Sequence, residues 1–204
     1  LGAALARAAV RGFQGEDYAQ PDRLLACVKH YVGYGVAEGG RDYDGGELSD
    51  ATLRDVYLPP FQAAVQAGVG SLMSAFLDLN GIPATANRRL LTDVLRGEWG
   101  FDGFVVSDWG SVQELILHGV AEDDAQAGAL SLRAGVDMDM VSGVYLNTLA
   151  ASLQAGRVTQ AEIDEAARRV LRVKQRAGLF ANPCTDPARA AQDIRRPESL
   201  ARAR

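Results

Sequence analysis

The 204-residue chain is poor in several residue types, and each shortage excludes a class of protein. Its two cysteines are too few for a disulfide framework, and its two histidines are too few for a zinc site built mainly from imidazoles. No apolar run approaches the ~20 residues that a membrane-spanning helix needs. A net charge of −5 argues against a nucleic-acid partner, which usually requires a basic face. What remains is a globular composition, with 48% hydrophobic and 23% charged residues.

Lysine is as scarce as histidine, because Lys29 and Lys174 stand against 19 arginines. The adjacent residues Lys29 and His30 therefore use half of the chain's lysines and half of its histidines. Residues 1–12 lack the layout of a signal peptide, so we expect no export signal in this piece. The glycine-containing turns include neither a P-loop nor a GxGxxG motif, so nothing favours a site for nucleotide phosphates.

Short apolar runs alternate with helical patterns along the chain. Each run becomes polar at its C-terminal end, which is typical of a strand buried on both faces of a parallel sheet. The predicted strands are residues 26–32, 71–76, 103–109 and 135–141. The predicted helices between and around them are residues 5–12, 49–67, 90–99, 123–134, 145–155 and 159–177. The alternation predicts an α/β fold made of parallel (β/α) units.

Two of these helices contain residues that mark a helix start or interrupt a helix. Thr159 and Glu162 form a capping box at the start of the helix 159–177. Pro59–Pro60 lies inside the helix 49–67 and is expected to bend or split it.

The number of strands indicates part of a larger fold. A closed eight-stranded barrel needs roughly 200 to 400 residues, and four strands fill half of one. We therefore expect residues 1–180 to form the C-terminal half of a TIM-type (β/α)8 barrel, whose open strand edges another segment covers. An open doubly wound sheet is the alternative. Residues 181–204 are proline-rich and are predicted to be a linker or tail towards a following domain.

Polar residues at the C-terminal ends of parallel strands mark the expected site. Asp108 follows the apolar run 104–106 and precedes Trp109. A carboxylate beside an aromatic ring suits a sugar, because the ring packs on the sugar's C–H surface and the carboxylate can attack the anomeric carbon. The alternative is an aspartate that only caps the next helix.

Lys29 and His30 end the first predicted strand and could donate hydrogen bonds to sugar hydroxyls. Adjacent residues of a regular strand point to opposite faces, so both can reach one ligand only where the backbone is irregular. We therefore predict a bulge, a sharp turn or a cis peptide near residues 30–32. The alternative is a lysine that extends from the rim and a histidine buried in the core.

Other polar or apolar candidates are less specific. Arg41 lies in the glycine-rich segment 35–48, which is either a functional loop or a solvated one. Met73 by itself has the pattern of a core residue. Asp137 and Asp139 could bind a metal, but no third ligand type gathers near them, so we assign them to the structure or the rim of the barrel and predict no metal site.

Four longer strings are more specific than these patterns. They are KHYVGYG at 29–35, GGRDYD at 39–44, NGIPATANRRLLTDVLRGEWGFDGFVVSDWGS at 80–111 and AARRVLRVKQRAGLF at 166–180. Together they resemble glycoside hydrolase family 3, most of all its β-glucosidase branch of bacterial periplasmic type, over roughly residues 10–190. The resemblance implies that Asp108 is the catalytic nucleophile. It also implies that the sugar-binding residues are Lys29, His30, Arg41, Met73 and Trp109.

The sequence departs from the family pattern, or stops short of it, in several places. Phe76 stands where many members have a tyrosine, which removes a hydroxyl partner for Asp108. Tyr34 stands where the hexosaminidase branch has a histidine, which argues against that branch. The resemblance implies that the acid/base Glu comes from a following α/β sandwich domain. Glu114, which we expect to face outward on a helix, is the local carboxyl that could replace it.

The expected function is a retaining hydrolase that removes β-D-glucosyl residues from the non-reducing end of oligosaccharides or glucosides. The resemblance implies no cofactor, and a periplasmic or secreted location. An alternative is that the isolated piece is a non-catalytic structural portion, because half of the barrel and the acid/base residue lie elsewhere. A Schiff-base lyase that uses Lys29 is a third interpretation, which would leave Asp108 and Trp109 unexplained.

Overall fold

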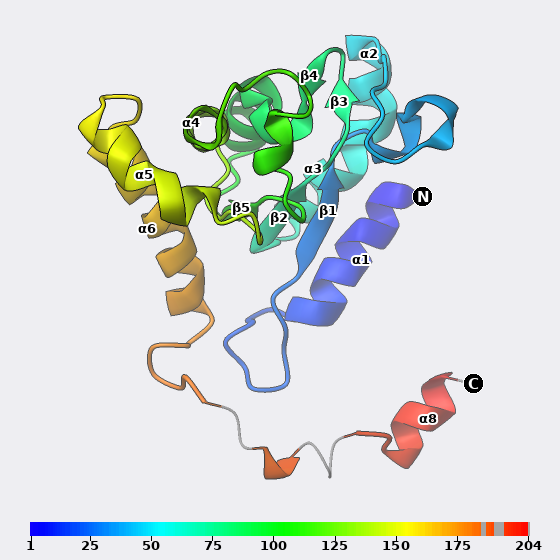
Figure 1. Ribbon diagram of the computed structural model, residues 1–204. Helices are drawn as coiled ribbons and strands as arrows, with labels where there is room; N and C mark the ends of the chain where they lie inside the picture. The colour runs from blue at the N-terminus through cyan, green and yellow to red at the C-terminus, as the bar shows by residue number, and fades with distance from the viewer. Residues whose placement is uncertain (185–186, 190–193, 204) are drawn as a thin grey trace.

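A parallel sheet organises the chain, and the computed structural model describes it over residues 1–184, 187–189 and 194–203. The strands are β1 (Cys27–Tyr31), β2 (Ser71–Ser74) and β5 (Phe104–Val106), in the spatial order β1-β2-β5 (Figure 1). Leu72 in the central strand pairs with Val28 on one side and Val105 on the other. The predicted α/β class with parallel (β/α) units is confirmed. A short antiparallel hairpin of β3 (Asp78–Leu79) and β4 (Ile82–Pro83) was not predicted.

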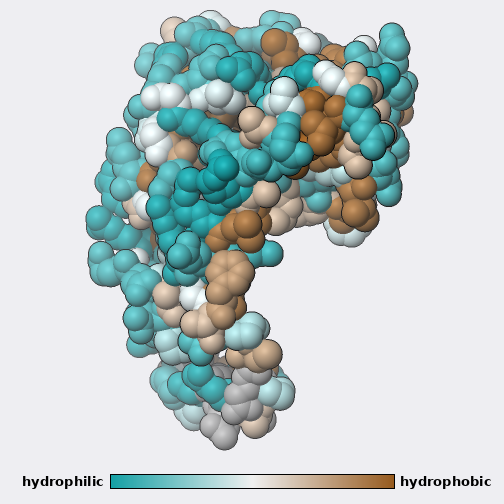
Figure 2. Space-filling view, turned by 90° about the vertical axis from the view of Figure 1, so that its left-hand side faces the viewer, coloured by the Kyte–Doolittle hydropathy of each residue, from teal (hydrophilic) through white to brown (hydrophobic). Residues whose placement is uncertain are grey.

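Helices surround the sheet and bury its apolar side chains. The helical elements are α1 (Gly2–Gln14), η1 (Tyr34–Val36), η2 (Glu38–Gly40), α2 (Asp50–Thr52), η3 (Leu53–Tyr57), α3 (Leu58–Gln66), η4 (Ala84–Ala86), η5 (Arg89–Glu98), η6 (Gln113–Leu115), α4 (Asp124–Ala134), α5 (Val144–Gln154), α6 (Gln160–Arg176) and α8 (Pro197–Ala203). The main core joins the sheet to α1, α3 and η5, and its fully buried members include Leu72, Leu91 and Val105. The face that carries α5 and α6 is mainly hydrophilic (Figure 2).

The helix predicted over 49–67 runs continuously through α2, η3 and α3, so the prolines do not split it. The helix widens into the π-helical turn η3, where the Leu58 amide donates to the carbonyl of Leu53. Pro59 and Pro60 then occupy the first turn of α3. Proline has no N–H to donate, so the prolines interrupt the hydrogen-bond ladder at this point of the continuous helix.

Helix capping follows the sequence signals closely. At α6, the Thr159 side chain accepts from the Glu162 amide and the Glu162 side chain accepts from the Thr159 amide, so the predicted capping box is present. At α4, the Asp123 side chain caps the first turn, and Gly135 ends the helix in the left-handed conformation. Local chemistry therefore fixes where these two helices begin or end.

The fourth predicted strand, residues 135–141, is not a strand. It forms one isolated parallel bridge with β5, between Val106 and Met138, in which the Met138 amide donates to the Val105 carbonyl and the Ser107 amide donates to the Met138 carbonyl. The reason is the side chain of Asp137, whose Oδ2 accepts the Val105 amide at 2.8 Å in place of a main-chain carbonyl. A carboxylate therefore replaces one rung of the ladder, and the segment runs beside β5 without forming a regular strand.

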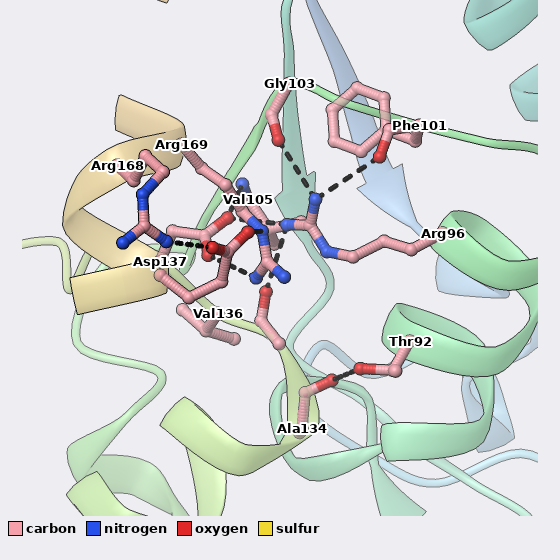
Figure 3. Close-up of polar contacts among 12 residues, drawn as sticks. Thr92, Arg96, Phe101, Gly103, Val105, Ala134, Val136, Asp137, Arg168 and Arg169 are labelled. Atoms are coloured by element: carbon pink, nitrogen blue, oxygen red, sulfur yellow. Dashed lines mark hydrogen bonds and ion pairs between the residues drawn. The ribbon is translucent and has the colours of Figure 1, made fainter. Parts of the chain in front are cut away.

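Two guanidinium groups complete the surroundings of Asp137 (Figure 3). Arg96 from η5 donates to Oδ2 at 2.6 Å, and Arg169 from α6 donates to Oδ1 at 3.0 Å. Arg96 also donates to the carbonyl of Gly103 at 3.0 Å, just before β5. Burial raises the pKa of the Asp137 carboxyl, while Arg96, the Val105 amide and Arg169 oppose that change. Asp137 thus ties η5, α6 and β5 together, which agrees with its assignment to the structure.

After α6, the chain extends away from the helices that pack around the sheet (Figure 1). All described residues beyond position 180 are exposed, including α8. The predicted boundary between a barrel portion at 1–180 and a linker at 181–204 stays a prediction, and part of that linker lies outside the described residues. Among the described residues, no helix is both long enough and apolar enough to cross a membrane.

Candidate active site

Asp108 lies in a tight turn directly after β5. Its main-chain carbonyl accepts the Ser111 amide at 3.2 Å, and Gly110 has a positive φ of 71° within the turn. Only 8% of the residue is exposed. Oδ1 accepts the amide of Trp109 at 2.7 Å, whereas Oδ2 is buried and accepts no hydrogen bond from the described part of the chain. The next helical element, η6, begins after Val112, so the interpretation of Asp108 as a helix cap is wrong.

His30 is the side chain that meets this carboxylate. Its Nε2 lies 3.3 Å from Oδ2 of Asp108. The register of β1 against β2 shifts between Val28 and Tyr31, and the Lys29–His30 and Tyr31–Val32 peptide bonds are cis. The predicted irregularity near residues 30–32 is therefore present. The structure brings two candidates, one from the end of β1 and one from the end of β5, to a single point.

The charge state of His30 follows from its surroundings. Burial lowers the pKa of the imidazole, and Lys29 lowers it further, while Asp108 and Asp42 raise it. A neutral imidazole near pH 7 has one N–H donor and one nitrogen acceptor. His30 can therefore serve as a hydrogen-bonding group for an uncharged ligand such as a sugar.

A row of aromatic rings extends from His30. Tyr34 stacks on the imidazole with 4.8 Å between ring centroids, and Phe76 lies 6.3 Å from Tyr34 and 4.6 Å from Tyr43. The Tyr34 hydroxyl donates to Asp42 at 2.6 Å, which joins the glycine-rich segment 35–48 to the end of β1. The sequence did not predict this row, because its members come from separate segments and each one alone has no distinctive signal.

Glu114 also belongs to this region, so the expectation that it faces outward is wrong. The side chain is half-buried, and its Oε2 is shielded without a hydrogen-bond partner in the described ranges. Burial raises the pKa of its carboxyl, with a further rise from Asp108 and Asp42, while His118 lowers it. The charge of Glu114 is therefore coupled to that of Asp108.

The remaining candidates are placed less centrally. Lys29 is exposed and lines an apolar groove between α1 and β1. Arg41 forms an ion pair with Asp44 at 2.8 Å, with 77% of its side chain exposed, rather than with Asp108. Met73 is half-buried in β2 opposite Val106. Trp109 is 63% exposed beside the carboxylate, where its ring is open to a ligand.

The loops around Asp108 are pinned to the β3–β4 hairpin. The carbonyl of Asp78 accepts the Gly46 amide at 2.9 Å, and its carboxylate lies 3.2 Å from Nδ1 of His118. The loop that follows β1 and the loop that follows β5 are thus attached to the same short hairpin. In the described part of the chain, no group of three or more His, Cys, Asp or Glu residues is placed to hold a metal ion.

A parallel (β/α) fold that gathers polar groups at the C-terminal ends of its strands is typical of α/β enzymes, barrel enzymes among them. Residues 1–173 match the model of the glycosyl hydrolase family 3 N-terminal domain. The chain belongs to glycoside hydrolase family 3.

Individual relatives agree with this assignment. The chain is 45% identical over 174 residues to a periplasmic β-glucosidase of Salmonella typhimurium, which covers 85% of the chain and 23% of that protein. It is 42% identical over 184 residues to a β-xylosidase of Formosa agariphila, which covers 84% of the chain and 25% of that protein. The crystal structure of a β-glucosidase from Listeria innocua superimposes with a TM-score of 0.93 at 40% identity, over 97% of this chain and 28% of that one. The chain spans about a quarter of the length of these relatives.

Proposed function

We propose that this chain supplies the nucleophile and part of the sugar-binding site of a retaining β-glucosidase. The observation that carries the proposal is the carboxylate of Asp108, which is buried at a strand end with Oδ2 free of hydrogen bonds and next to His30. A nucleophile needs an oxygen whose lone pairs are not already taken, and Oδ2 has that property. The relatives' activities as β-glucosidases and β-xylosidases support the same reaction type.

In the proposed reaction, an oxygen of Asp108 attacks the anomeric carbon of the terminal sugar. The bond from that carbon to the glycosidic oxygen breaks, and a second carboxyl group gives its proton to the leaving oxygen. A water molecule then attacks the same carbon, gives a proton back to the second carboxylate, and releases Asp108 and the sugar. The two inversions give net retention. The two carboxyl groups of such an enzyme stand about 5–5.5 Å apart.

The other candidates would hold the sugar. His30 and Lys29 would donate to hydroxyl groups, and Trp109 would pack on the C–H face of the ring. Arg41 would have to exchange its ion pair with Asp44 for a sugar hydroxyl, which its exposure makes inexpensive. Met73 would add apolar contact at the end of β2.

We place the second carboxyl outside this chain, on a following domain that residues 181–204 would lead to. The remaining part of the barrel would cover the open edge of β1. We further propose a periplasmic or secreted location, in line with the first of these relatives. A specificity for β-xylosides is the second candidate, because the β-xylosidase relative is nearly as similar as the β-glucosidase.

The test compares this chain with a longer chain that has the length of its relatives, using chromogenic β-glucoside and β-xyloside substrates. We expect the longer chain to cleave the glucoside faster than the xyloside, and the 204-residue chain to cleave neither. In the longer chain, Asp108→Asn should lower kcat by at least about 10³-fold with sugar binding retained. Unchanged turnover in this variant would refute the assignment of Asp108. A faster rate on the xyloside would replace the glucosidase by the second candidate.

A further inference from the structure

Three buried hydroxyl groups form a chain close to the candidate site. The Oγ of Ser74 lies 2.9 Å from Oγ1 of Thr85, which lies 3.0 Å from Oγ of Ser111. The three residues are 0%, 1% and 3% exposed, respectively. They come from the end of β2, from η4 and from the turn after β5. The hydroxyl chain therefore connects three segments that share no strand pairing at this point.

One end of the hydroxyl chain belongs to the turn that carries Asp108. The amide of Ser111 donates to the carbonyl of Asp108 at 3.2 Å. The hydroxyl of Ser107 donates to the same carbonyl at 3.0 Å and accepts the Met140 amide at 2.8 Å. The backbone of Asp108 is thus held from two sides. Ser107 anchors it to the segment beside β5, and Ser111 anchors it through Thr85 to β2.

Thr85 is the middle member, so its hydroxyl makes both bonds of the hydroxyl chain. Removing that hydroxyl would leave the buried hydroxyls of Ser74 and Ser111 without this partner. Buried polar groups that lose their partners favour rearrangement, because no water is at hand to replace the bond. The turn from Asp108 to Ser111 would then lose its tie to the centre of the sheet.

We propose that Thr85 is a positioning residue that acts through Ser111 to hold the carboxylate of Asp108 against His30. The consequence for catalysis rests on the proposed function, since it requires Asp108 to be the nucleophile. The consequence for geometry does not rest on the proposed function, because the distance between Asp108 and His30 affects the pKa of His30 whether or not a substrate is turned over.

The test uses His30, one of the two histidines of the 204-residue chain, as its probe. The charged groups that act on His30 are Asp108, Lys29 and Asp42, and Asp108 raises the pKa of the imidazole. If Thr85→Val lets Asp108 move away, the titration midpoint of His30, measured by NMR, should shift to lower pH. Thr85→Ser keeps the hydroxyl and should titrate like the native chain.

Thr92→Val is the matched control. The same substitution there removes a single hydrogen bond of 2.8 Å from Thr92 to the carbonyl of Ala134, which lies at the end of α4. We expect the His30 midpoint to be unchanged in this variant. An unchanged midpoint in folded Thr85→Val would overturn the proposal. Should Thr85→Val fail to fold, Ser111→Ala removes one end of the hydroxyl chain and must give the same downward shift.

Kinetics of the longer chain provide the second readout. Displacing a nucleophile by a fraction of an ångström to 1 Å should lower kcat about 10- to 100-fold in Thr85→Val. KM should change less than kcat, because Trp109 is the one proposed sugar-binding residue within the loosened turn, and Thr85→Ser should restore kcat. If the native longer chain cleaves no glycoside, the proposed function fails, while the His30 titration still decides the positioning role of Thr85.

Discussion

Asp108 and Asp137 are two carboxylates near β5 with different surroundings: 12% of the Asp108 side chain is exposed, against 1% of the Asp137 side chain. Taken as whole residues, both are 8% exposed. Asp108 follows the end of β5, and Asp137 lies in the segment that is bridged to β5 through Val106 and Met138. Both oxygens of Asp137 are occupied, by the Val105 amide and by two guanidinium groups. Asp108 has one oxygen bound to an amide of its own turn and one oxygen that accepts no hydrogen bond from the described residues.

The difference separates a carboxylate that holds the structure from one that can react. Transferring an ionised carboxylate out of water is costly unless charges and hydrogen bonds replace the solvent. Asp137 has that replacement in full, so its charge is used to join helices to the sheet. Asp108 has it only in part, because Oδ1 accepts the Trp109 amide while Oδ2 has only the His30 imidazole at 3.3 Å. The two roles therefore differ in how fully the oxygens are hydrogen-bonded, and the fully bonded carboxylate is also the more deeply buried one.

The largest expected effect on stability comes from removing the charge of Asp137, because both of its oxygens accept hydrogen bonds. Asp137→Asn would leave Arg96, with 11% of its side chain exposed, without its counter-ion, and would leave Arg169, with 21% exposed, only its ion pair with Glu165. We expect the free energy of unfolding to fall by about 3–5 kcal/mol, measured by urea denaturation. Asp108→Asn should change it by less than about 1 kcal/mol, because the amide can keep the Trp109 contact. Equal losses in the two variants would contradict the comparison.

A smaller effect is expected from the pH dependence of the Asp108 region. Burial holds the pKa of His30 below its usual value, so the unfolded chain takes up a proton more readily than the folded one. Stability from this source is present above the unfolded pKa of about 6.5 and is lost as the pH falls towards the folded pKa. His30→Gln should therefore flatten the fall in denaturation midpoint below pH 6.5. The same slope in the variant and the native chain would show that other groups cause it.

The smallest effect should come from an exposed carboxylate with a comparable ion pair. Asp102 lies 2.6 Å from Arg176, with 58% and 47% of the two side chains exposed. Water and salt screen such a pair, so Asp102→Asn should cost no more than about 1 kcal/mol in thermal or urea denaturation. A loss as large as that of Asp137→Asn would mean that the contact geometry, and not desolvation, sets the size of these effects.

Much of the fold could be predicted from local signals. The apolar runs located three of the strands, and capping chemistry at Thr159 and Glu162 fixed the start of α6. The segment 135–141 was assigned wrongly, because its apolar and polar alternation resembles a strand while the side chain of Asp137 takes a rung of the ladder. The β3–β4 hairpin was not predicted, because strands of two residues have no periodic pattern in the sequence.

The site was predictable only in part, for a similar reason. Asp108 and His30 stood out because a polar residue after a buried strand points to the active end of a parallel sheet. Their proximity was an inference that the structure bears out at 3.3 Å. The stacking of Tyr34 on His30 and the inward position of Glu114 depend on how loops pack, which no local pattern encodes.

The sequence by itself determined the family, the parallel (β/α) order, the helix ends and the identity of the two candidate partners, because these depend on residue type and on spacing along the chain. The tertiary structure alone decided which buried carboxylate is saturated and which has a free oxygen. That distinction requires donors from η5 and α6 to converge on Asp137, while Oδ2 of Asp108 has the His30 imidazole at 3.3 Å and accepts no hydrogen bond within the described chain. Hydrogen-bond satisfaction is a property of distant segments brought together, so only the folded chain reveals it.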